Sequence, residues 1–294
     1  MITQLSILIP VYNSCCVKMV TQLQSLCEAI IQPFDYEIIV ADDGSTDIQT
    51  LQNNQEINTL PHSSFIKKEK NTGSASTRNF LATHSHYPWL LFLDCDMTIP
   101  DKHFIQRYLA ETHYDVVNGG IRIGIGKASR QNLRYLYEKQ GESKHVVEKR
   151  NRMGFREFRS TNFLIRHALI AQVPFDERFT KSGYEDVHYG RTLSLQGATI
   201  LHIDNPLVLD DFEDNPTYLL KCERNWCTLY RFHDELQGFS RLLTLCQRLA
   251  PFAPLIRLWH RLFGAVERRH LTGPHPTLFI FNLYRIGYYI SIKI

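Results

Sequence analysis

The segment Trp89-Leu-Leu-Phe-Leu-Asp-Cys-Asp96 joins five consecutive apolar residues to two carboxylates. A short apolar run of this kind is typical of a strand that is buried on both faces of a sheet, so we predict a strand at 89–93. Two similar runs precede it, at 5–10 and 36–41, and a weaker run at 64–68 predicts an edge strand. The first third of the chain is therefore predicted to supply four strands.

Stretches with a helical spacing of apolar residues separate these strands, at 17–31, 47–55 and 73–84. Strands that alternate with helices in this way build α/β folds, in which a mostly parallel sheet carries helices on both faces. After residue 100 the patterns predict strands at 115–123, 159–165 and 198–203, and helices at 129–149 and 184–195. We predict one α/β domain over 1–215, with a Rossmann-like, mostly parallel central sheet.

From about residue 218 onward only helical patterns occur, which predicts a helical extension over 216–294. Residues 231–294 hold nine Arg or Lys and three Asp or Glu residues, so this segment carries a net charge of +6. Leucines and aromatic residues recur there at helical spacing between 242 and 262. Two interpretations stay open: these helices pack on the main domain, or they form a basic amphipathic surface that binds anionic lipid.

The composition of the whole chain argues against several classes of protein. With 33 basic and 30 acidic residues the net charge is only +3, which argues against binding to nucleic acid. The number of cysteines, seven, is odd, and no two of them form a Cys-x-x-Cys pair. Free thiols in a reducing compartment are the simplest interpretation. The sequence contains no recognisable signal peptide and no apolar stretch of about 18 residues, so we expect a cytoplasmic protein. If the basic extension binds lipid, we expect the protein to be peripheral on the inner face of the membrane.

Pairs of carboxylates follow two of the predicted strands. Asp42 and Asp43 come directly after 36–41, and Asp94 and Asp96 follow 89–93. Ligands of open α/β sheets bind beyond the carboxyl ends of the strands, where carboxylates can accept hydrogen bonds from a base and a ribose. Alternate residues of an extended segment point to the same side, so Asp94 and Asp96 are predicted to face one cavity. There they would suit a hard divalent cation.

An Asp-rich turn with a helix cap is the structural alternative for the first pair, and chance occurrence is the alternative for the second.

A third acidic pair, Glu185-Asp186, opens the predicted helix 184–195. Acidic residues in the first turn of a helix interact favourably with its dipole, which is the structural explanation of the pair. The functional explanation is a carboxylate base beside a bound sugar. Each acidic pair is weak evidence when taken alone, so their combination decides the interpretation.

Six motifs in order over about residues 4–212 resemble those of the family 2 glycosyltransferases, which have the GT-A fold. The motifs are Ser6-Ile-Leu-Ile-Pro-Val-Tyr-Asn13, Val40-Ala-Asp-Asp-Gly-Ser-Thr-Asp47, Asn71-Thr-Gly-Ser-Ala-Ser-Thr-Arg-Asn79, Phe92-Leu-Asp-Cys-Asp96, Phe175-Asp-Glu-Arg-Phe179 and Gly183-Tyr-Glu-Asp186. The resemblance implies an inverting, metal-dependent enzyme that transfers a hexose or N-acetylhexosamine from a UDP-sugar to a saccharide or lipid-linked glycan. It also implies a role in the biosynthesis of cell-surface polysaccharide, with Mn²⁺ or Mg²⁺ as cofactor.

The same resemblance implies roles for individual residues. Asp186 matches the catalytic base, and Glu185 matches a residue that binds the acceptor or orients the site. Asp96 matches the metal ligand, and Asp94 is a second candidate ligand. The residues implied to bind the nucleotide sugar are Pro10, Val11, Asn13, Asp42, Asp43, Asn71, Gly73, Arg78, Asp94 and Cys95.

The third metal ligand departs from the pattern of the family. Relatives often carry a histidine after the strand that follows the Glu-Asp motif. In this chain Asp210 stands where that histidine is expected, and its carboxylate still suits a hard cation. We predict Asp210 as the third ligand, with His202 as the second choice.

Three other classes of protein are alternatives. A nucleotidyltransferase would carry a glycine-rich basic loop after the first strand, where this chain has Tyr12-Asn-Ser-Cys-Cys16. A dinucleotide-dependent oxidoreductase needs a Gly-x-Gly-x-x-Gly turn, and Gly120-Ile-Arg-Ile-Gly-Ile-Gly126 has a different spacing. A non-catalytic protein that binds sugar nucleotides would not need all the carboxylates at 94, 96, 185 and 186.

Overall fold

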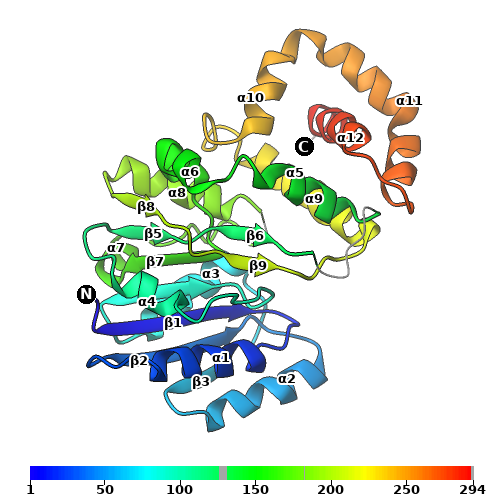
Figure 1. The fold of residues 1–294 in the computed structure, drawn as a ribbon. Helices are drawn as coiled ribbons and strands as arrows, with labels where there is room; N and C mark the ends of the chain where they lie inside the picture. The colour runs from blue at the N-terminus through cyan, green and yellow to red at the C-terminus, as the bar shows by residue number, and fades with distance from the viewer. Residues whose placement is uncertain (126–130, 182, 293–294) are drawn as a thin grey trace.

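The computed structural model describes residues 1–125, 131–181 and 183–292. Gly126 and the first two residues of the predicted helix 129–149 lie outside these ranges. The α/β prediction is confirmed: a seven-stranded sheet forms the centre of the molecule, in the order β3-β2-β1-β4-β7-β5-β8 (Figure 1). Four of its six strand pairs are parallel.

The first four strands closely match the predicted ranges. They are β1 (Gln4–Val11), β2 (Asp35–Asp42), β3 (Ser63–Lys67) and β4 (Trp89–Leu93), and neighbours in this half of the sheet run parallel. Ile7 and Ile9 are buried in one core and Leu8 in the other, as the two-residue period of a strand requires. Both faces of β1 are therefore apolar.

Helices cover both faces of the sheet. On one face lie α1 (Val17–Glu28) and α4 (Phe104–Leu109), whose apolar residues share a core with Ile7 and Ile9. On the other face lie α3 (Ser74–His84), α7 (His167–Gln172) and α8 (Glu185–Leu195), which share a core with Leu8. The short helix α2 (Ile48–Gln55) flanks the β3 edge (Figure 1).

The second half of the sheet contains one antiparallel strand. β7 (Asn162–Arg166) runs antiparallel to both β4 and β5 (Val116–Asn118), and β8 (Ile200–His202) pairs parallel with β5. The strand predicted at 115–123 is interrupted at Gly119 and Gly120. A side chain at 119 would collide with Tyr108 and Asn205, and Gly120 has a positive φ of 85°. The chain then continues as β6 (Ile121–Ile123), which pairs with β9 (Leu207–Leu209) in a separate small sheet.

The helix predicted at 129–149 is two helices within the described residues, α5 (Leu133–Glu142) and α6 (Val147–Met153). The C-terminal segment is helical, as predicted, and consists of α9 (Asn215–Arg231), α10 (Arg241–Arg248), α11 (Ala253–Leu271) and α12 (Leu278–Ser291). Figure 1 shows α10 and α11, coloured orange, in an arc beyond α5 and α9 at the end of the molecule away from β1 and β2, with the red α12 inside the arc. Within the described ranges, no helix combines the length and the apolar character that a bilayer span requires.

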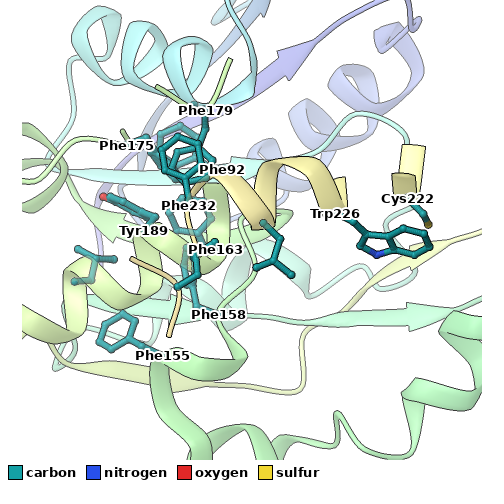
Figure 2. Packing of buried hydrophobic residues seen from close by; sticks show 14 of the residues in the cluster. Phe92, Phe155, Phe158, Phe163, Phe175, Phe179, Tyr189, Cys222, Trp226 and Phe232 are labelled. Carbon is teal, nitrogen blue, oxygen red and sulfur yellow. The ribbon is translucent and has the colours of Figure 1, made fainter. Parts of the chain in front are cut away.

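Stacked aromatic rings connect the end of α9 to the sheet (Figure 2). Phe92 of β4 stacks on Phe163 of β7 with ring centroids 4.9 Å apart. Phe179 stacks on Phe232, just after α9, at 4.0 Å. The C-terminal helices and the sheet therefore share one core, which extends from Leu8 to α12.

Candidate active site

A cavity of about 1370 Å³ lies beyond the carboxyl ends of β1, β2 and β4. Its lining includes Asp43, Asp96 and Asp186, three carboxylates that are far apart along the chain. Of the residues predicted for the site, eleven line this cavity. They are Pro10, Val11, Asp43, Asn71, Gly73, Arg78, Asp94, Cys95, Asp96, Glu185 and Asp186. The structure thus brings the three predicted acidic pairs to one end of the sheet.

Asp43 holds the loop between β3 and α3 in place. Its carboxylate accepts hydrogen bonds from the backbone N–H groups of Thr72 (2.9 Å) and Gly73 (2.8 Å), and Lys68 Nζ lies 2.7 Å away. The side chains of both Asp43 and Lys68 are nearly buried. Because these bonds fix the backbone beside Asn71, Asp43 shapes the wall of the cavity as well as lining it.

Asp42 and Asn13, also predicted to bind the nucleotide sugar, do not line the cavity. Asp42 is fully buried and accepts hydrogen bonds from the backbone N–H and the hydroxyl of Ser45. The Asn13 side chain accepts hydrogen bonds from the N–H groups of Thr46 (2.9 Å) and Asp47 (3.1 Å). Asn13 thus connects the loop after β1 to the loop after β2, and Asp42 fixes the second of these loops, next to the cavity-lining Asp43.

Asp94 and Asp96 face the cavity at the end of β4, and Arg78 of α3 lies next to them. Arg78 Nη2 donates a hydrogen bond of 2.8 Å to Asp94 Oδ1, and its Nη1 lies 3.6 Å from Glu185 Oε1. Arg78 is buried, yet its Nε and Nη1 atoms have no hydrogen-bond partner among the described residues. The positive charge of Arg78, at the wall of the cavity, would attract an anionic ligand.

The surroundings of Asp96 suit a cation. Asp96 is open to the cavity, and partial loss of solvation there, together with the neighbouring Asp94 carboxylate, raises its pKa, although Arg134 and Lys221 partly offset this effect. The carboxylates of Asp94 and Asp96 repel each other, and a hard divalent cation with oxygen ligands would compensate their charge. Asp94 and Asp96 therefore fit the cation site that the motif predicts.

A strained turn presents Glu185 and Asp186 to the cavity. Gly183 has a φ of 107°, and Tyr184 has a φ of 67°, which is uncommon for a residue with a side chain. Glu185 then accepts hydrogen bonds from Ser74 Oγ (2.8 Å) and the N–H of Gly183 (2.9 Å), which connects α8 to α3. Glu185 is thereby fixed in position, whereas Asp186 bonds only to the adjacent N–H of Val187 (2.8 Å) among the described residues.

The electrostatic environment of Asp186 differs from that of an ordinary carboxyl. Burial and the adjacent Glu185 carboxylate raise its pKa to about 6. A carboxylate whose pKa lies near neutrality is a stronger proton acceptor than an ordinary one and is still ionised at pH 7. The position and the basicity of Asp186 both suit general-base chemistry.

The two candidates for a third metal ligand lie outside the lining. Asp210 follows β9, and its neighbour Val208 pairs with Thr98 across an isolated bridge, which brings this strand beside the loop that carries Asp96. His202 is buried in β8, where its Nε2 lies 3.0 Å from the carbonyl of Gly154, and burial lowers its pKa to about 4. Asp210 thus follows the strand that pairs beside the Asp96 loop, and its role as a ligand stays a prediction.

A second group of potential metal ligands lies elsewhere. Three residues, Asp176, His188 and Glu235, each offer one ligand atom, and these atoms all lie within 4.8 Å of one another. Arg178 joins this group, because its Nη2 lies 2.6 Å from Asp176 and 2.7 Å from Glu235. With a guanidinium already bridging the two carboxylates, we interpret the group as an ion-pair network that connects α8 to the segment after α9.

The sequence motifs did not identify the wall of the cavity that faces the acidic residues. That wall comes from α5, α9 and α12 and includes Arg134, Lys221, Trp226, Phe281 and Arg285. No linear motif marks these residues, and the only signal in the sequence was the helical, basic character of the C-terminal segment. The helical extension therefore forms part of the cavity itself.

The chain matches a family model and known proteins. A family model described as glycosyl transferase family 2 matches residues 6–177. Chondroitin synthase of Escherichia coli is 27% identical over 244 residues, which cover 69% of this chain and 35% of the relative. The chain thus spans about a third of the length of that relative.

Solved structures share the fold. TarS 1-349 from S. aureus matches with a TM-score of 0.54 and 18% identity, over 98% of this chain and 90% of that one. Mannosyltransferase PcManGT from Pyrobaculum calidifontis, solved with GDP-Man and Mn²⁺, matches with a TM-score of 0.57 and 14% identity, over 96% and 85% of the two chains. Since the family model covers more than half of its length, the chain belongs to glycosyl transferase family 2.

Proposed function

We propose that the protein transfers a hexose or N-acetylhexosamine from a UDP-sugar to a hydroxyl of a saccharide or lipid-linked glycan, with inversion at the anomeric carbon. The convergence of Asp43, Asp94, Asp96 and Asp186 in one cavity is the observation that carries this proposal. The cavity exceeds the roughly 300–1,000 Å³ of an ordinary ligand pocket, so it has room for a donor and an acceptor together.

In the proposed reaction the acceptor hydroxyl oxygen forms a bond to the anomeric carbon while the bond from that carbon to the diphosphate oxygen breaks. Asp186 takes the proton of the hydroxyl as the attack proceeds. Arg78, which lines the cavity, places its positive charge beside the negative charge of the diphosphate. Glu185 accepts hydrogen bonds from Ser74 and Gly183, and these bonds fix the start of α8, and with it Asp186, beside the reacting groups.

We also propose that Asp96 and Asp94 hold a divalent cation, Mn²⁺ or Mg²⁺, with Asp210 as a further ligand. Bound there, such a cation would act as a Lewis acid that stabilises the charge of the departing diphosphate. The structural neighbours TarS 1-349, solved with UDP-GlcNAc, and PcManGT, solved with GDP-Man and Mn²⁺, support a nucleotide-sugar donor and a cation.

The acceptor and the pathway belong to the same proposal. We propose that the enzyme acts in the synthesis of cell-surface polysaccharide, as a peripheral protein on the inner face of a membrane where a lipid-linked acceptor is available. The basic charge of residues 231–294 supports this location, since anionic lipids attract basic segments.

A donor screen tests the proposed function. The melting temperature is measured with UDP, UDP-GlcNAc, UDP-glucose and GDP-mannose, each with and without Mn²⁺, because a ligand that binds the folded state raises the midpoint. A UDP-sugar that stabilises the protein is then assayed for Mn²⁺-dependent release of UDP. We expect both effects for at least one UDP-sugar. Binding without any turnover would favour the alternative of a non-catalytic protein that binds sugar nucleotides.

A further inference from the structure

Helix α11 exposes an apolar stripe. Six large side chains on it are 42–67% exposed, and they are Leu255, Leu258, Trp259, Leu262, Phe263 and Val266. At 3.6 residues per turn these positions lie within an arc of about 140° on one side of the helix. Phe252, just before α11, lies within the same arc and lengthens the stripe toward the start of the helix. Its side chain is 59% exposed. We call these seven residues the α11 stripe.

The stripe faces away from the protein. The residues of α11 that are buried instead, Gly264, Glu267 and Leu271, lie on the opposite side of the helix. His260, on the same inner side, packs against Tyr284 of α12 with ring centroids 5.3 Å apart. A surface helix of a soluble protein normally turns its apolar side to the core. In α11 this polarity is reversed, and a contiguous exposed patch of this kind marks an interaction surface.

Arginine side chains lie on α11 and at the end of α10. Arg248, Arg261 and Arg269 are exposed, and none of them forms an ion pair among the described residues. Arg257 and Arg268, by contrast, donate hydrogen bonds to Ile290 O (3.0 Å) and Glu223 Oε1 (2.9 Å), which anchor α11 on α12 and α9. The helix is thus fixed to the molecule while its apolar stripe and three arginines stay available.

We propose that the α11 stripe inserts into the interfacial region of an anionic lipid bilayer, with Arg248, Arg261 and Arg269 contacting lipid headgroups. Leucine, tryptophan and phenylalanine on one side of a helix that also carries arginines are the features of interfacial amphipathic helices. A second copy of the chain is the competing occupant. A symmetric dimer through this stripe would bring the same arginines together, and that repulsion disfavours it.

The α11 stripe would mediate the peripheral location given above, and in this respect it rests on the proposed function. The cavity is lined by Phe281 and Arg285 of α12, against which α11 packs. A bilayer contact through α11 would therefore hold the α12 wall of the cavity near the membrane, where a lipid-linked acceptor enters.

Vesicle flotation of the full chain tests the proposal. Vesicles of phosphatidylcholine are compared with vesicles that also contain phosphatidylglycerol. We expect the wild-type chain to float with the second kind only, and salt to weaken the binding. The double variant Leu255→Gln/Leu262→Gln should reduce partitioning by about tenfold or more, since membrane binding scales with buried apolar area. Arg261→Gln/Arg269→Gln should reduce it as well.

Leu195→Gln serves as the matched control, because Leu195 of α8 is 69% exposed, close to the 67% of Leu255. This variant should float like the wild type. Stripe variants that bind anionic vesicles as well as the wild type would overturn the proposal. A wild-type dimer that fails to float and that Leu255→Gln/Leu262→Gln converts to a monomer would assign the stripe to a second copy instead. The stabilisation of all variants by UDP with Mn²⁺, measured in parallel, reports on the donor site independently.

Discussion

At the scale of single residues, Asp186 governs the expected pH dependence. Its pKa is raised to about 6, so below that pH the carboxyl is protonated and cannot accept the proton of the acceptor hydroxyl. We predict that kcat/KM for transfer rises as the pH increases through about 6 and then levels off. Initial rates on both sides of that pH check this prediction. A profile that is flat across it would argue against Asp186 as the base.

The same pKa makes a prediction about stability. In the folded state the pKa of Asp186 exceeds the ordinary value of 3.8, so ionisation is disfavoured there and stability falls as the pH rises from 3.8 to about 6. Asp186→Asn removes the charge at pH 7. We predict that this variant loses roughly 10²–10⁴-fold in turnover, retains binding of UDP, and melts at a higher temperature than the wild type at pH 7.

Glu185→Gln provides the contrasting variant. Glu185 accepts two hydrogen bonds, from Ser74 and Gly183, and also lies beside Arg78. Removing its charge weakens bonds that the folded state uses, so this variant should melt at a lower temperature. Equal changes in melting temperature for the two variants would show that the two carboxylates share one environment, contrary to the geometry.

Substitution of Asp96 tests whether the protein binds a divalent cation at this position. If Asp96 holds the cation, Mn²⁺ raises the melting temperature in the presence of UDP for the wild type, and Asp96→Ala abolishes that increase. Excess chelator should abolish it in the wild type too. Asp204→Ala is the control, because Asp204 is exposed and does not line the cavity. A Mn²⁺ effect that survives in Asp96→Ala would place the cation elsewhere.

At the scale of elements, the apolar runs predicted the strands well because burial on both faces leaves a strong local signal. β4 coincides with the predicted range 89–93. The direction of β7 could not be predicted in the same way, since a parallel and an antiparallel strand at 162–166 would show the same pattern. The interruption at Gly119 and Gly120 depends on the distant residues Tyr108 and Asn205, which the local sequence does not reveal.

The contact between α11 and α12 supports a prediction at this scale. Gly287 of α12 faces His260 of α11, and a Cβ atom at 287 would lie 2.7 Å from His260 Nδ1. Gly287→Val must therefore push the helices apart, and overpacking of this kind typically costs about 1–3 kcal/mol. Urea unfolding measures the loss, and limited proteolysis should cut α11 faster. Gly273→Val, where the nearest atom lies 3.4 Å away, should have a much smaller effect.

At the scale of the whole molecule, the acidic half of the cavity was predictable and the opposite half was not. The acidic pairs follow strands or open a helix, and the order of strands in an α/β sheet fixes where such positions meet. Trp226 and Arg285, in contrast, reach the cavity only because α9 and α12 pack over the end of the sheet. That packing involves aromatic contacts such as Phe179 with Phe232, which join residues more than fifty positions apart.

This shared core leads to a prediction about the expected boundary between 1–215 and 216–294. Many large side chains from the segment after 215 are buried in the same core as Leu8 and Phe92, and they include Tyr218, Leu219, Trp226, Leu229 and Phe232. At about 1.5–3 kcal/mol for each buried side chain, their loss is comparable to the roughly 5–15 kcal/mol that stabilises a typical protein. We therefore predict that residues 1–215 alone bind a hydrophobic dye and show no cooperative melting, whereas the full chain does melt cooperatively. A sharp thermal transition and UDP binding by residues 1–215 would instead identify two independent domains.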